Sequence, residues 1–570
     1  MRNKRKRVLL INPPLISTET IAGSIPVLLG SLLQANIETS VIDFNIEFIK
    51  EILSKKYLNH TKNYLKKIYQ NPISINKNIN KKYQLSSEQI EKQRKLIHTY
   101  LFANKKITNK IINIADTLYD EYIKAKREDN IQKIRKFTML IQIASKFAFL
   151  PYFPEEIEIE PFYTKNNPLY KKNYEDILDR CKNRKRNIYI NVFNRILKKF
   201  NIKDFDIVAI SITHNSNFYP ALTLSQIIKK KYGSNIVIGG TFINTTIKSF
   251  IKYPKMFGFF FDALLVGNGE KSITQYVSAI EKHNKPINVN GAIYKDKNKI
   301  IKNKNINYKK NKLTISLDGL NLKQYSSNKI NIQFSTSCYW NKCLFCHSIK
   351  NKMPTNINIS DAVNVIESFT KEYKINSFGI VDNAITPNFL KIFSEEIIRR
   401  KIEISYTAYM RFDENLTLNI LKSAYKSGLK SIFFGLESAS ERIISLIKKG
   451  IKIKTAENIL QYCRELGIHT KVGIIYNIPT ETEDELNETL CFINRNKEKI
   501  SIISYNQFIL LKNSNIIRKN LAKELQISNI REEEEFSTYY LFDSPRIKDS
   551  SIIKIFQNNK ITKPNNEINW

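Results

Sequence analysis

Three cysteines stand within nine residues of one another, at Cys338, Cys343 and Cys346, in the run CYWNKCLFC. This C-x4-C-x2-C run follows a predicted strand at 331–337, so we expect it to form a loop. Three thiolates gathered on one loop can hold three corners of a cubane iron–sulfur cluster. The fourth iron would then be open to a chelating substrate.

Zinc binding and simple burial are the alternatives to a cluster on this triplet. Structural zinc needs a fourth ligand, but His347 directly adjoins Cys346 and no second cysteine pair lies within 100 residues on either side. Three unrelated buried cysteines fit poorly with the polar Asn341 and Lys342 between them. Six cysteines in 570 residues are also too few for a disulfide scaffold. The spacing therefore favours a cluster.

The elements around this loop alternate between strand and helix from 328 to about 510. Six strand-like runs, from NIQFSTS at 331–337 to SIISYNQFIL at 501–510, are separated by helical patterns. This alternation is typical of parallel sheets and predicts a partial (β/α)6 barrel. Barrels place their chemistry beyond the carboxyl ends of the strands, where the cysteine loop lies.

A second α/β domain of about five strands is predicted from two separate pieces, 7–48 and 206–282. Ligands of such open sheets lie beyond the carboxyl ends of the strands, where glycine lets backbone approach a large ligand closely. The residues predicted at these ends are Asn12, Asp43, Thr213, Gly239, Gly240, Gly267 and Gly269.

We therefore divide the chain into five parts. They are an α/β domain (1–50 and 200–290), a helical insertion without strands (51–199), a hairpin and linker (291–327), the barrel (328–510) and a C-terminal extension (511–570). Within the extension, REEEEF at 531–536 is interpreted as a solvated helix face.

The composition is that of a folded protein with a strong positive charge. Hydrophobic residues make up 42% and charged residues 25%, which argues against disorder and fibrous structure. The formal net charge of +38 is compatible with nucleic acid, an acidic peptide or an anionic membrane surface as partner, and also with a nucleotide bias that enriches Lys, Asn and Ile. No apolar run reaches the length of a membrane span, so we expect a cytoplasmic protein.

With these motifs the sequence resembles the radical S-adenosylmethionine (SAM) superfamily, and specifically its cobalamin-binding class. The resemblance covers 7–48 and 202–510. Its cysteine motif is usually C-x3-C-x2-C, one residue shorter than here, with an aromatic residue at the position of Phe345. The resemblance implies a [4Fe-4S] cluster on Cys338, Cys343 and Cys346, and SAM on the open iron. The implied N-terminal domain is a Rossmann-like, cobalamin-binding parallel sheet.

The resemblance also implies further SAM-binding residues at successive strand ends. Asp382 and Asn383 follow the second strand, Arg411 the third, Glu437 and Ser438 the fourth, and Gly473 lies in the fifth. Taken singly, such residues are more often salt-bridged carboxylates, surface charges or helix caps. Their order along the barrel is what supports a shared role.

For cobalamin, the resemblance assigns Asn12, Thr213, Gly239, Gly240, Gly267 and Gly269 to the binding edge. The Asp-x-His-x-x-Gly signature of other cobalamin folds is absent, and His214 is the nearest histidine candidate. The alternative is a sheet that binds no corrinoid and serves as a docking surface.

The activity implied is methyl transfer to an unactivated carbon of a peptide or small natural product. One electron from a donor such as flavodoxin or ferredoxin would cleave SAM, the resulting radical would remove a substrate hydrogen, and methylcobalamin would supply the methyl group. Two alternatives stay open: a radical SAM enzyme that modifies tRNA or performs a non-methylating rearrangement, and a non-catalytic corrinoid or nucleic-acid binding protein.

Overall fold

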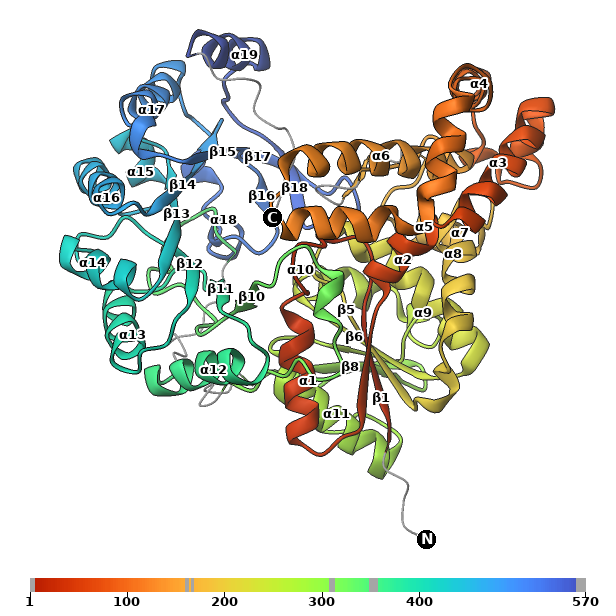
Figure 1. The fold of residues 1–570 in the computed structure, drawn as a ribbon, viewed down its shortest axis with the longest axis horizontal. Helices are drawn as coiled ribbons and strands as arrows, with labels where there is room; N and C mark the ends of the chain where they lie inside the picture. Colours follow the sequence, from red (N-terminus) through yellow and green to blue (C-terminus); the bar gives the residue numbers. More distant parts are fainter. Residues whose placement is uncertain (1–5, 159–162, 166–168, 307–312, 348–356, 560–570) are drawn as a thin grey trace. The chain divides into compact units, whose positions relative to one another are not determined.

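The computed structural model describes residues 6–158, 163–165, 169–306, 313–347 and 357–559. The chain forms two compact units. The first comprises 1–306, 314–328 and 534–537, and the second comprises 307–313, 329–533 and 538–570. Figure 1 traces both units along the sequence.

The first unit contains a seven-stranded sheet with the order β2-β1-β5-β6-β7-β8-β9. All residues of β1 and β5 are buried, as expected of strands covered on both faces by helices. The strands are β1 (Val8–Asn12), β2 (Thr39–Asp43), β5 (Ile207–Ser211), β6 (Asn235–Gly239), β7 (Ala263–Leu265), β8 (Ala292–Asp296) and β9 (Lys299–Lys302).

Strand β1 lies at the point where the strand order reverses. Val8 pairs in parallel register with Thr39 of β2 on one side and with Ile207 of β5 on the other. In open α/β sheets the ligand crevice lies outside the carboxyl ends of the strands at such a point. Here those ends are Asn12 of β1 and Ser211 of β5.

The sheet is larger than the predicted five strands because the hairpin at 291–327 belongs to it. Strand β8 pairs antiparallel with β7, through Ala263 and Tyr294, and with β9. The apolar residues Ala292, Ile293 and Tyr294 of β8 are buried, which is why this hairpin joins the core instead of forming a separate linker.

Helices make up most of the segment predicted to be a helical insertion. They are α3 (Lys55–Gln70), α4 (Ser87–His98), α5 (Lys105–Arg127), α6 (Ile131–Phe149), α7 (Tyr174–Lys182) and α8 (Ile188–Ile196). The prediction of no strands is wrong, since β3 (Glu156–Glu158) and β4 (Tyr163–Lys165) form a small antiparallel hairpin. The other helices of this unit are α1 (Ser24–Gln34), α2 (Phe44–Ile52), α9 (Phe218–Tyr232), α10 (Thr241–Lys252) and α11 (Gly269–His283).

The interpretation of REEEEF as a solvated helix face is also wrong. Arg531 ends strand β17, and Glu534–Ser537 belongs to the first unit. Phe536 is fully buried, and its ring centroid lies 4.9 Å from that of Phe250. The carboxylate of Glu535 accepts hydrogen bonds from the Tyr253 hydroxyl and the Tyr174 backbone N–H. Packing of Phe536 into this aromatic cluster buries the segment, although its four Glu side chains would favour exposure to solvent.

The second unit contains the predicted six-stranded parallel sheet, in the sequential order β10 to β15. Its strands are β10 (Ile330–Ile332), β11 (Ser377–Ile380), β12 (Ser405–Met410), β13 (Leu429–Glu437), β14 (His469–Tyr476) and β15 (Ile502–Gln507). Its helices between the strands are α12 (Ile359–Glu372), α13 (Pro387–Arg399), α14 (Leu418–Lys426), α15 (Glu441–Leu446), α16 (Ile453–Leu466) and α17 (Glu483–Arg495). The α/β architecture expected from the sequence is confirmed.

The C-terminal extension adds a small sheet and two helices to this unit. The sheet has the order β16-β18-β17, formed by β16 (Leu510–Leu511), β17 (Ser528–Arg531) and β18 (Tyr539–Asp543). The helices are α18 (Asn515–Arg518) and α19 (Asp549–Asn558), and Phe556 of α19 packs on Tyr476 of β14. Within the described residues, no helix is both long enough and apolar enough to cross a bilayer.

Candidate functional site

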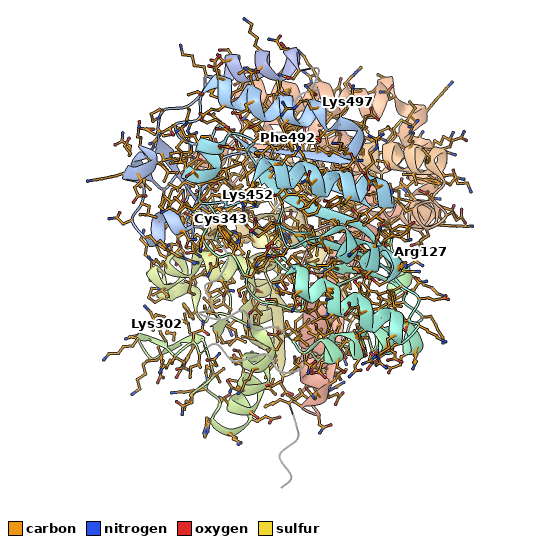
Figure 2. All side chains as sticks on the ribbon, turned by 90° about the vertical axis from the view of Figure 1, so that its left-hand side faces the viewer. Arg127, Lys302, Cys343, Lys452, Phe492 and Lys497 are labelled. Carbon is orange, nitrogen blue, oxygen red and sulfur yellow. The ribbon has the colours of Figure 1, made fainter. Side chains whose placement is uncertain are left out.

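The cysteine loop leaves β10 and is held in place by the C-terminal extension. Cys343, labelled in Figure 2, is buried, while Cys338 and Cys346 are partly exposed. The Asn515 side-chain amide donates to the Cys343 carbonyl (2.8 Å), and the Asn515 backbone N–H donates to the Cys346 carbonyl (3.2 Å). Leu344, between these cysteines, is buried with Ile516 in one apolar cluster. The loop is therefore anchored through its backbone carbonyls, and these hydrogen bonds do not use the three thiols, which can still bind a ligand.

The thiols suit a cluster better than a single ion. Among the described residues, no three Cys, His, Asp or Glu side chains converge closely enough to bind one metal ion. In a cubane each cysteine binds a different iron, so its three sulfurs need not meet at one point. The donor set, three soft thiols without an added histidine or carboxylate, matches iron–sulfur chemistry.

Arg411 is buried and lies beside the cysteines, as its position after β12 predicts. Its Nη1 is 3.8 Å from the Cys343 sulfur, and its Nη2 donates to the Lys449 carbonyl. Burial raises the pKa of Cys343, whereas the positive charges of Lys449 and Arg411 oppose that rise. Arg411 can thus stabilise a thiolate at Cys343.

Trp340, inside the cysteine loop, packs on the residues that follow α15. Its indole Nε1–H donates to the Lys448 carbonyl (2.8 Å), and the guanidinium carbon of Arg411 lies 4.6 Å from its ring centroid. Gly450, at φ +63°, allows this contact, because a Cβ there would stand 2.0 Å from the indole. The ring therefore fixes both the loop and Arg411.

Glu437 ends β13 in an unusual backbone conformation. The register with β14 shifts between Gly435 and Glu437, and Glu437 has φ +69°. Such a bulge turns a side chain away from the regular strand direction. Glu437 Oε1 accepts from Lys449 Nζ at 2.7 Å, with the two side chains only 13% and 7% exposed. The barrel end therefore carries a nearly buried ion pair close to Cys343.

Asp382 lies at the end of β11 and helps to form a pocket next to the cysteine loop. Its carboxylate accepts the backbone N–H of Phe334 at 2.6 Å. The pocket is also lined by Ser337 and Tyr339, and the buried Ser337 hydroxyl makes no hydrogen bond within the described residues. Asn383 is exposed. Polar groups from two neighbouring strand ends thus converge beside Cys338.

Ser438 and Gly473 have clear packing roles. The Ser438 hydroxyl lies 3.1 Å from the Thr489 hydroxyl and accepts the backbone N–H of Ser440. Gly473 faces Phe433, whose ring would lie 3.0 Å from an added Cβ. Ser438 thus packs just beyond the end of β13, and Gly473 makes room for Phe433 within β14.

Glu481, in the run NIPTET (477–482) after β14, has a buried carboxyl group. It is 4% exposed, one oxygen accepts the Ile478 backbone N–H (3.2 Å), and Oε1 has no hydrogen-bond partner among the described residues. Burial, with a smaller contribution from Glu485, raises its pKa to about 7, although the backbone hydrogen bonds from Ile478 and Asn477 and the weaker attraction of Arg442 oppose this rise.

This carboxyl should make stability depend on pH. Its ordinary pKa of 4.5 is raised in the folded state, so folding favours the protonated form and stability falls as pH rises through about 7. We expect Glu481→Gln to stabilise the protein by about 3 kcal/mol at about pH 8, and by less than about 1 kcal/mol at about pH 5, in urea unfolding.

Glu485 provides the opposite control for that measurement. Its carboxylate binds Arg442 at 2.6 Å, and this hydrogen bond lowers its pKa to about 2. Its stabilising effect is present above its ordinary pKa, so Glu485→Gln should destabilise the protein at about pH 8. A Glu481→Gln variant equally stabilised at both pH values would contradict the assignment.

In the first unit, Asn12 and Asp43 bind each other at the carboxyl ends of β1 and β2. The Asn12 amide donates to Asp43 (3.0 Å), which also accepts from the Tyr325 hydroxyl and caps α2. At the carboxyl end of the neighbouring strand β5, the Thr213 hydroxyl lies 2.8 Å from His214 Nδ1. Partial desolvation by neighbouring groups lowers the pKa of His214, whose side chain is exposed. The polar residues predicted at these ends are thus close to the point where the strand order reverses.

The glycines at the strand ends are accounted for by contacts within the chain. A Cβ on Gly240, which has φ +113°, would lie 2.1 Å from the Ile212 carbonyl oxygen. The corresponding neighbours are Leu265 for Gly239 (3.3 Å), Asn305 for Gly267 (2.8 Å) and Leu28 for Gly269 (3.0 Å). The space that each glycine leaves is therefore filled by the protein itself, and these glycines give no separate support for a bound macrocycle.

Sequence reasoning missed Lys449 and Asn515. Lys449 belongs to the unremarkable run IKKG, and its meeting with Glu437 depends on the turn after α15. Asn515 lies 172 residues from the Cys343 carbonyl it binds. Its only local signal is the preceding Ser514, whose hydroxyl caps α18.

Comparison with known proteins gives a family match over the second unit. Residues 332–493 match the model of the radical SAM superfamily. An uncharacterized methyltransferase, PH0819 of Pyrococcus horikoshii, is 26% identical over 313 residues, which are 53% of this chain and 66% of the relative. The alignments span between 26% and 66% of the lengths of the curated relatives.

Two groups of solved structures share the fold. The radical SAM methyltransferase TsrM from Kitasatospora setae, solved with cobalamin and a [4Fe-4S] cluster, has a TM-score of 0.55 at 12% identity and covers 90% of this chain and 78% of its own. The cobalamin-dependent radical enzyme OxsB, with aqua-cobalamin and SAM, has a TM-score of 0.53 at 17% identity, over 65% of this chain and 59% of its own.

Proposed function

We propose that the chain is a cobalamin-dependent radical SAM methyltransferase that acts on an unactivated carbon, starting from the match of residues 332–493 to the radical SAM superfamily. The observation that carries the proposal is the anchored loop of Cys338, Cys343 and Cys346 beyond β10, with Arg411 3.8 Å from the Cys343 sulfur. Three thiols with a buried cation beside them suit an anionic iron–sulfur centre.

In this proposal, a cluster and SAM held at this loop would supply the radical chemistry that removes a substrate hydrogen, and bound cobalamin would supply the methyl group. The chain's own residues hold and orient these groups. Arg411 and Lys449 place positive charge beside Cys343. Glu437 keeps Oε2, which makes no hydrogen bond within the described residues, for a ribose hydroxyl. The Ser337 hydroxyl, beside Asp382, is available to a polar group of SAM.

For cobalamin, we propose the edge beyond β1 and β5, because this is where the strand order of the sheet reverses. Thr213 and His214 are the side chains there that can meet a polar ligand. The cobalamin in the TsrM and OxsB structures supports a corrinoid site in this chain, and two of the four curated relatives are named methyltransferases, which supports the proposed reaction. A reduced flavodoxin or ferredoxin is the proposed electron donor.

The test is anaerobic reconstitution with iron and sulfide, followed by SAM and a reductant. We expect brown protein that releases 5′-deoxyadenosine when substrate is present, and a corrinoid extractable from protein purified with cobalamin. Protein that binds iron but no corrinoid would exclude the methyltransferase while leaving a radical SAM enzyme. Protein without iron would exclude both.

A further inference from the structure

Part of the net charge is concentrated in one segment of the first unit. Residues 55–110 hold fourteen Lys and Arg against two Glu, so about a tenth of the chain carries +12 of the total +38. A uniform nucleotide bias would spread the charge along the chain. This segment contains α3, α4 and the start of α5, which lie next to one another at the outer edge of the unit, away from its sheet (Figure 1).

The antiparallel packing of α3 and α5 aligns the cations of this segment. The Lys62 ammonium donates to Asn109 at 2.7 Å. Lys62 and Lys66 are one helical turn apart on α3, as Lys105 and Asn109 are on α5, so Lys66 lies opposite Lys105. Burial and then repulsion from Lys66 and Lys105 lower the pKa of Lys62. Three ammonium groups are therefore gathered along one seam.

Aromatic rings continue the same seam by one turn. Tyr69 of α3 lies 5.2 Å from Phe102, and Phe102 lies 5.3 Å from His98 of α4, between ring centroids. The Arg94 guanidinium stands over Tyr69 at 5.3 Å. Phe102 stays 51% exposed despite these contacts. We name this set the basic–aromatic seam: Lys62, Lys66, Tyr69, Arg94, His98, Phe102 and Lys105.

The positive charges of the seam are not neutralised by close carboxylates of the described residues. In the part of the chain that the structure describes, neither Lys66 nor Lys105 has a carboxylate within ion-pair distance, and the contact of Arg94 with Glu91 is 3.9 Å long. Like charges held together destabilise a fold unless an anion relieves them. An exposed aromatic side chain next to them offers an apolar contact to the same partner.

We propose that the basic–aromatic seam docks an acidic peptide segment that also carries apolar side chains. Carboxylates would bind Lys62, Lys66 and Lys105, and an apolar side chain would cover Phe102. A nucleic acid is the less suitable partner, because stacking of bases needs open ring faces. Here Arg94 covers Tyr69, and Phe102 contacts both Tyr69 and His98.

This docking proposal rests on the proposed function in one respect: the docked peptide would be the substrate of the enzyme. Its test uses the full-length protein without cofactors, so its failure and that of the radical chemistry can be told apart. The probe is a fluorescent peptide of about 20 residues composed mainly of Glu and Leu, and binding is followed by anisotropy. A labelled oligothymidine of about 20 nucleotides is the second probe.

We expect the peptide to bind more tightly than oligothymidine. Its affinity should fall at least about tenfold in the double variant Lys66→Glu/Lys105→Glu. Phe102→Ser should lower the affinity for the peptide by about fivefold even at salt concentrations that screen the charges. Lys391→Glu/Lys422→Glu is the matched control, because both lysines are exposed on helices of the second unit. It should change binding by less than about twofold.

Two outcomes would overturn the proposal. One is peptide binding that is absent, or is reduced equally by the seam and control variants. The other is oligothymidine binding tighter than that of the peptide and lost in the seam variant, which would assign the seam to nucleic acid. Thermal unfolding of each variant checks that exposed substitutions have left the fold intact.

Discussion

Replacing Cys343 with serine should abolish the iron–sulfur cluster. The wild-type chain, reconstituted without oxygen, is expected to hold about four iron atoms, and Cys343→Ser to lose the brown colour and nearly all the iron. Serine is close to cysteine in size, and the backbone anchors of the loop, from Asn515 to the carbonyls of Cys343 and Cys346, do not involve the sulfur. The loss would therefore report the missing thiolate.

Two other cysteines are matched controls for this experiment. Cys463 is fully buried in α16, where burial raises its pKa to about 12, and Cys491 is exposed on α17. Cys463→Ala and Cys491→Ser should keep the iron content of the wild type. Iron and sulfide measured by colorimetry, with the visible spectrum, decide the result. A Cys343→Ser variant with full iron content would remove this residue from the ligand set and with it the proposed function.

The cysteine loop was predictable because its signal is local. Three thiols within nine residues, after an apolar strand, need no knowledge of distant contacts. The same holds for the α/β alternation, since each buried strand shows its own apolar run. Arg411 was predictable for a related reason: it follows β12 directly, so its place at the strand ends comes with the strand.

The contacts that support the site were not predictable in this way. Asn515 and Cys343 lie 172 residues apart, and neither position shows a pattern that names the other. Glu437 was expected at a strand end, but the bulge that turns it toward Lys449 depends on a register shift against β14. Phe536 is surrounded by charges in the sequence, and only the aromatic cluster around it accounts for its burial.

The glycines illustrate how one pattern can have two causes. Glycine at a strand end predicts close approach of another group, and in Gly240 this approach is real: the Ile212 carbonyl fills the space. The sequence cannot distinguish a ligand from the protein's own backbone at that position, because both need the same absent Cβ.

Breaking the nearly buried ion pair of Lys449 and Glu437 should cause a large loss of stability. Removing one member leaves the other charge without its partner in a site of low solvent access, so Lys449→Met and Glu437→Gln should each destabilise the cofactor-free protein by about 3 kcal/mol. Combined in one chain, the two substitutions remove both charges. The double variant should therefore be about 2 kcal/mol more stable than the sum of the single effects predicts.

The exposed pair of Lys452 and Glu414 is the control for this cycle. Its atoms are 2.9 Å apart, close to the 2.7 Å of the buried pair, but its side chains are 77% and 66% exposed. Lys452, labelled in Figure 2, lies three residues beyond Lys449, and Lys452→Met should leave the stability unchanged, because solvent screens an exposed pair. Additive single effects at Glu437 and Lys449 in urea unfolding would mean that the two charges do not interact. Because the measurement needs no cluster, it tests whether the barrel end holds this pair before any cofactor binds.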